Sequence, residues 1–136
     1  MMPSRRRLRL ARIFSPHGVI LKVDLDREHW LTAGMSESVP AKYYSNRVYL
    51  AQFPSVRTVG RFAPASELRV AGLLWPEARM RLANSAYCTR ESMGQGQIIL
   101  FADDPNFRAY FRGTERLLSN AILYGPGLGT RWTPDW

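Results

Sequence analysis

Two histidines are the residues on which a metallopeptidase site in this sequence would depend. His17 and His29 lie twelve positions apart, and neither belongs to a His-x-x-Glu or His-Glu-x-x-His pattern. Such patterns supply zinc ligands and a general base at fixed spacing. We therefore expect neither histidine to bind zinc, although a site completed by distant carboxylates is an open alternative. No metal or cofactor site is assigned.

Asp103 and Asp104 are a second candidate, because they follow an apolar segment and α/β sheets often place functional groups at the ends of such strands. Paired carboxylates can bind a metal or share one proton. Neighbouring residues on a strand point in different directions, however. We expect these side chains to cap their loop and to form ion pairs with Arg108 or Arg112 instead.

Cys88 is the only cysteine, which excludes an intramolecular disulfide and a zinc site built on cysteines. It lies in the segment Ser-Ala-Tyr-Cys-Thr, whose alternation predicts a strand and a buried structural thiol. No base stands nearby in the sequence to activate it. Ser92 and Ser119 likewise lack the Gly-x-Ser-x-Gly pattern of serine hydrolases. No catalytic residue is therefore assigned, and the chain alone is expected to have no enzymatic activity.

Gly94 and Gly96 invite comparison with a phosphate-binding loop. A dinucleotide-binding fingerprint has three glycines, follows a strand and opens a helix. Here two glycines precede an apolar segment typical of a strand. They predict a tight turn between two strands, for which glycine supplies the backbone freedom.

Length and charge indicate one globular domain with an ordinary surface. The 136 residues carry a formal charge of +8, and five of the positive charges are arginines between Arg5 and Arg12. Removing these five leaves +3, so nucleic acid is not favoured as a partner. Arginines interleaved with aromatic residues between Phe107 and Arg112 suggest base stacking, but packing explains them equally well.

No apolar run of 18 residues occurs, so no membrane span is predicted. The basic start also lacks the continuous apolar segment of a secretory signal, and it gives no indication of the protein's location.

Apolar periodicity predicts an α/β domain. We expect strands at residues 18–24, 47–53, 55–62, 85–91 and 97–102, and a further apolar run at 68–74. We expect helices at 75–84 and 114–124, and loops at 36–46 and 63–66. Residues 98–101 are apolar at consecutive positions, which predicts a strand buried on both faces in a sheet with helices on each side.

Several segments, taken in their order and spacing, carry a resemblance to a known family. They are Asp26–Gly34, Gly72–Glu77, Met93–Arg108, Gly113–Thr114 and Asn120–Ala121. Together they resemble the C-terminal region of bacterial zinc carboxypeptidase-like proteins of the carboxypeptidase A superfamily. In those proteins a region similar to class I glutamine amidotransferases follows the peptidase domain.

The resemblance implies a flavodoxin-like, amidotransferase-like sheet with flanking helices, of which this chain holds only the later part. It divides the chain into a basic, poorly ordered extension (1–16), the amidotransferase-like region (17–126) and a tail (127–136). The family's peptidase residues have no counterpart here. The amidotransferase nucleophile has none either, because Cys88 lies within a predicted strand and not at a strand-to-helix turn.

These inferences favour a non-catalytic accessory or interaction domain, and the resemblance adds that it is a truncated gene product of the carboxypeptidase-like family. Two alternatives stay open: a subunit that completes a metallocarboxypeptidase in trans, and a basic nucleic-acid-binding protein. The expected partner is a peptidase domain or a second copy of the chain, and no small molecule is identified. Because an incomplete sheet leaves an edge and an apolar face uncovered, we expect the isolated chain to self-associate.

Overall fold

The computed structural model describes residues 13–50 and 54–129, and in this part the protein is a mixed α/β domain. Its elements, in chain order, are β1 (Val19–Leu25), the 3-10 turn η1 (Trp30–Thr32), β2 (Ser38–Tyr43), β3 (Val56–Phe62), β4 (Arg69–Ala71), α2 (Pro76–Leu82), β5 (Ala86–Met93), β6 (Gly96–Phe101), the 3-10 turn η2 (Phe107–Ala109) and α3 (Arg112–Tyr124).

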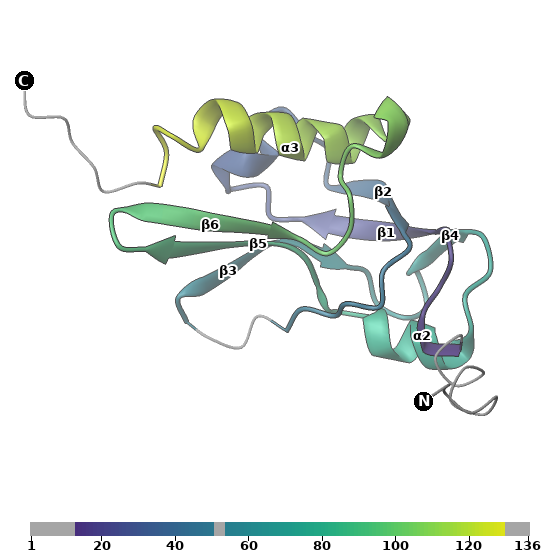
Figure 1. Cartoon of the computed structure of the whole chain (residues 1–136). Helices are drawn as coiled ribbons and strands as arrows, with labels where there is room; N and C mark the ends of the chain where they lie inside the picture. The colour runs from purple at the N-terminus through teal and green to yellow at the C-terminus, as the bar shows by residue number, and fades with distance from the viewer. Residues whose placement is uncertain (1–12, 51–53, 130–136) are drawn as a thin grey trace, which may run out of the picture.

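The strands form one curled sheet in the order β2-β1-β3-β5-β6, with β4 also paired to β1 (Figure 1). Every pairing is antiparallel. A flavodoxin-like sheet is parallel, so that part of the expectation is not confirmed. The connections explain the difference: parallel neighbours need a long crossover, usually a helix, whereas here β5 and β6 are joined by a two-residue turn and α3 follows the last strand.

The core is built from alternate residues of the strands and from a row of aromatic rings. In β1 the buried and half-buried positions alternate strictly from Val19 to Leu25. Phe62 lies between Tyr43 and Tyr87, with ring centroids 5.3 and 5.5 Å away and edge-to-face geometry. All three rings are at most 1% exposed, so they fix how β2, β3 and β5 pack.

α2 and α3 lie within two residues of the bounds expected for them. α2 begins at Pro76, a position where the backbone N–H would have no partner within the helix, so proline loses no hydrogen bond there. Asn84 follows the helix, and its φ of 61° prevents the helix from continuing. α3 packs against η1 and β2 (Figure 1). At its start a Cβ on Gly113 would lie 2.7 Å from Cγ1 of Val39, so only glycine allows this close approach.

Two segments differ from the expectation. Residues 36–46 were expected to be a loop but contain β2, in which Val39, Ala41 and Tyr43 alternate inward around Pro40. Residues 47–53 were expected to be a strand; among those described, Tyr49 alone forms a bridge, to Ala86. Residues 51–53 lie outside the described part, as do 1–12 and 130–136, which hold most of the expected extension and tail.

The prediction that residues 98–101 are buried on both faces is wrong. They belong to β6, which is an edge strand paired only with β5. Leu100 is 45% exposed, whereas Ile99 and Phe101 pack against the core. The strand is apolar on both faces, but only one of its faces is covered.

Candidate interaction surface

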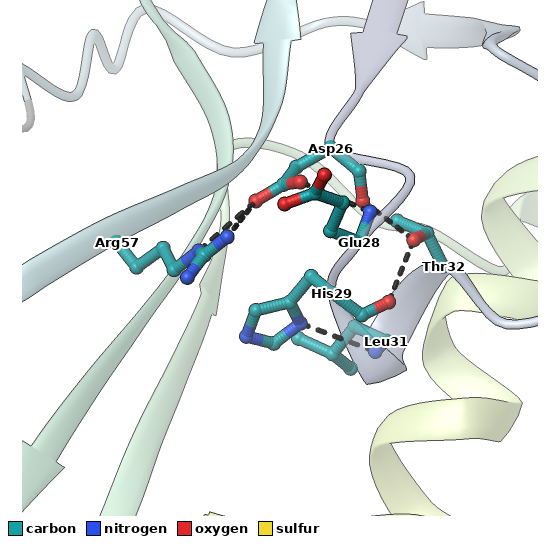
Figure 2. A network of polar contacts seen from close by, with 6 residues as sticks. All are labelled: Asp26, Glu28, His29, Leu31, Thr32 and Arg57. Carbon is teal, nitrogen blue, oxygen red and sulfur yellow. Dashed lines mark hydrogen bonds and ion pairs between the residues drawn. The ribbon is translucent and has the colours of Figure 1, made fainter.

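The turn that follows β1 holds a network of polar side chains (Figure 2). Arg57 donates from Nε and Nη2 to Oδ2 of Asp26, at 2.9 and 2.7 Å. The backbone N–H of Glu28 donates to the other carboxylate oxygen at 3.2 Å. Burial alone would raise the pKa of Asp26, but these bonds outweigh it and lower the pKa below its ordinary value. Asp26 thus ties this turn to β3 as a carboxylate.

His29 caps η1 in the same turn. Its Nδ1 accepts the backbone N–H of Leu31 at 3.1 Å, so this nitrogen carries no proton. Burial lowers the pKa of the imidazole, and the positive charge of Arg57 adds to the effect. The Thr32 hydroxyl lies 2.7 Å from the carbonyl oxygen of His29 and closes the turn. A neutral, capping His29 accounts for the histidine without a metal.

The other histidine lies near the two aspartates, at a cavity of about 630 Å³ lined by residues that follow β2 and β6. His17 contacts the edge of the Tyr44 ring, with centroids 5.1 Å apart. Oδ1 of Asp104 accepts the N–H of Asn106 at 2.9 Å, and Asp103 accepts that of Asp104 at 2.7 Å. The expected loop capping is therefore confirmed. In the described residues, no three His, Cys, Asp or Glu side chains are grouped to hold a metal ion.

Asp103 has a different ionic partner from the one expected. Its Oδ1 lies 3.8 Å from Nζ of Lys42, on β2, and its other oxygen accepts the backbone N–H of Tyr44. Arg112 instead pairs with Glu115 at 3.5 Å, and the Arg108 guanidinium lies 5.3 Å from the Phe107 ring. The sequence missed this contact because residues 36–46 were not expected to be a strand.

The remaining candidates have structural roles. Cys88 is buried in β5, and burial raises the pKa of its thiol to about 12, so the nucleophilic thiolate is strongly disfavoured. Ser119 donates to the carbonyl oxygen of Glu115 at 3.0 Å. Gly94 has a φ of 58° and opens the two-residue turn between β5 and β6, in the pattern of a type II′ turn. The expected tight turn is confirmed.

Apolar side chains gather on the face of β5 and β6 that is turned away from α3. Cross-strand pairing places Ile98 beside Glu91 and Leu100 beside Thr89 on this face. A shallow groove of about 190 Å³ runs along it, and we call its apolar lining the outer apolar surface: Val48, Leu50, Val56, Ile98 and Leu100. Leu50 is 64% and Leu100 45% exposed, so side chains suited to burial are in water here.

The backbone of β6 is open along its outer edge. The N–H of Ala102 donates to the carbonyl oxygen of Tyr87 at 2.8 Å. Since hydrogen-bonded pairs alternate in an antiparallel ladder, Gly96, Ile98 and Leu100 bond to β5, and the N–H and C=O of the residues between them point outward. These are Gln97, Ile99 and Phe101, and no strand of the described part lies beside them.

No protein-family model, no curated protein and no solved structure matches the chain. In the described residues no helix is both long and apolar enough to cross a membrane.

Proposed function

We propose that this chain is a non-catalytic interaction domain that packs its outer apolar surface against another folded protein. The observation that carries the proposal is the exposure of Leu50 and Leu100 around an apolar groove on an open sheet. Contiguous exposed apolar residues mark protein contact sites more often than single ones do. The residues that could carry out chemistry support the same proposal, because they have structural roles: His29 caps η1, Cys88 is buried in the core, and Asp103 bonds to the backbone of Tyr44.

The proposed partner is a folded domain, either the peptidase domain of a zinc carboxypeptidase-like protein or a second copy of the chain. The first follows from the resemblance of Gly72–Glu77 and Met93–Arg108 to the accessory region of that family, and it belongs to the proposal alone. A sheet face of this kind buries apolar side chains against a partner, and the Glu91 carboxylate that also lines the groove has a donor within the chain, the Ser55 hydroxyl at 3.1 Å.

A single charge placed on the surface tests the proposal. We expect Leu100→Glu to weaken association about tenfold or more, because burying a leucine is worth about 1.5–3 kcal/mol and burying a carboxylate costs more. Met80→Glu is the matched control, since Met80 is 72% exposed on α2 and does not line this groove. Sedimentation of the chain alone, and with a carboxypeptidase-like domain added, measures both arms.

A monomeric wild-type chain that binds no added peptidase domain would refute the proposal. Equal effects of the two glutamate variants would do the same, because association would then not depend on this face.

A further inference from the structure

We infer that the edge of β6 pairs with β6 of a second copy of the chain, in antiparallel register centred on Ile99. This deepens the proposed function by naming the partner and the bonds. Gln97, Ile99 and Phe101 turn their N–H and C=O groups away from β5, so three residues offer a ready ladder to an incoming strand.

The register follows from which backbone groups are free. An incoming strand has to place its own outward residues opposite these three. Centring the pair on Ile99 sets Ile99 against Ile99 of the second copy and Gln97 against Phe101 of the second copy, so all three outward residues of each chain bond. Such a pair has two-fold symmetry, which is the commonest symmetry of protein dimers.

The side chains of β6 fit a second copy of themselves. The strand reads Gly-Gln-Ile-Ile-Leu-Phe and has no charged residue, so no like charges meet when it pairs with itself. In this register Ile98 lies directly opposite Leu100 of the second copy, and both side chains stand on the outer apolar surface. Apolar residues facing each other across strands stabilise an antiparallel pair.

The opposite edge of the sheet does not offer the same contact. The N–H of Leu25, on β1, donates to the carbonyl oxygen of Glu37, just before β2, and the alternation of the ladder then turns Ser38, Pro40 and Lys42 outward. Pro40 has no N–H to donate, and Lys42 carries a charge. The pairing therefore uses β6 of both copies and gives a closed dimer.

Cysteine cross-linking between two different variants tests the register. Ile98 and Leu100 of the second copy would form a non-hydrogen-bonded pair, whose Cα atoms lie about 4.5 Å apart, within the range of a disulfide. We expect Ile98→Cys mixed with Leu100→Cys to give a disulfide-linked heterodimer under mild oxidation. Either variant alone should cross-link several-fold less, because its cysteine faces an unchanged residue. The native Cys88 is buried and does not compete.

Other outcomes separate this inference from the function on which it rests. Absence of the mixed cross-link in protein that melts like the wild type would overturn the inference. Equal cross-linking of the single variants would also overturn it, since it shows another register or random collision. If the cross-link fails while Leu100→Glu still weakens binding of an added peptidase domain, the proposed function stands and only the self-pairing is wrong.

Discussion

The two edges of the sheet are built differently, although both are short strands with one neighbour. β2 presents Pro40 and Lys42 along its edge, and the next outward N–H, that of Tyr44, is taken by the carboxylate of Asp103. β6 presents only uncharged residues, and no strand of the described part lies beside it. One edge is closed by its residues, and the other leaves its outward backbone groups without a neighbouring strand in the described part of the chain.

α3 adds to this difference, because it packs more closely on the sheet near β2 than near β6. Near β2 it lies so close that Gly113 tolerates no side chain against Val39. Near β6 a cavity of about 310 Å³ remains, lined by Gln97, Ile99 and Ala121 among others. The helix is therefore seated on the β2 side and leaves room on the β6 side.

The largest expected effect comes from removing the side chain that seats α3. Asn120 is 2% exposed and donates to the carbonyl oxygens of Leu31 and Ala33, at 2.8 and 3.1 Å. Asn120→Ala leaves both acceptors without this donor, and we expect a loss of about 2–3 kcal/mol in the free energy of unfolding. Urea denaturation measures it.

Ser119→Ala is the control on the neighbouring residue, since Ser119 bonds only within the helix. It should change the free energy of unfolding by less than about 0.5 kcal/mol. Similar losses in the two variants would show that α3 is not anchored through η1.

A smaller effect is expected at the cap of η1, the turn on which α3 is seated. His29→Ala removes the acceptor for the N–H of Leu31 and should cost about 0.5–2 kcal/mol, whereas His29→Asn keeps a capping oxygen and should cost less. Thermal melts of the three proteins at pH 7.5 rank them. Equal melting of the alanine and asparagine variants would exclude a capping role.

The same residue gives the stability a pH dependence of known sign. The pKa of His29 is lowered by burial in the folded chain, from an ordinary value of 6.5. At a pH between the lowered pKa of the folded chain and 6.5, the unfolded chain binds more protons than the folded chain. The contribution of His29 to the free energy of unfolding is therefore full above pH 6.5 and falls as the pH decreases below it. His29→Asn should lack this slope, which urea denaturation at pH 7.5 and 5.5 detects.

The smallest effect on folding, but a visible one on assembly, is expected at the closed edge. Pro40→Val restores an outward N–H to β2 and should change stability by less than about 1 kcal/mol. A chain with two open edges joins neighbours on both sides, so assemblies larger than a dimer should appear in light scattering as concentration rises. Pro64→Val, in an exposed loop, is the control. A mass unchanged from wild type would mean that Pro40 does not close the edge.

The sequence predicted the middle of the fold better than its edges. β1, β3, β5, the turn at Gly94 and both helices have clear apolar or glycine signals. β2 was missed because Pro40 interrupts an alternation that Val39, Ala41 and Tyr43 nevertheless keep. The available signal was the proline itself, because within a sheet proline is confined to edge strands, strand starts and bulges.

The exposure of the outer apolar surface could not be predicted from the sequence for a related reason. The run Ile98–Phe101 shows that a strand is apolar on both faces, but the pattern does not tell which neighbours cover it. Exposure of Leu100 depends on α3 lying on one face only, and that is decided by contacts such as Asn120 with Leu31. The contact between Lys42 and Asp103 depends likewise on where β2 lies.

The two-residue turn at Gly94 also sets an order in time. Closing the hairpin of β5 and β6 orders very little chain, and hairpins form in about 1–10 μs. Packing of α3 against η1 takes longer, because the bond from Asn120 to the carbonyl oxygen of Leu31 spans 89 positions. Closing such a long loop costs more conformational entropy than closing a hairpin. During synthesis the hairpin also emerges before the helix. For part of every folding event an apolar strand therefore exists without its cover, and the crowding of newly made chains then affects whether it meets α3 or another copy first.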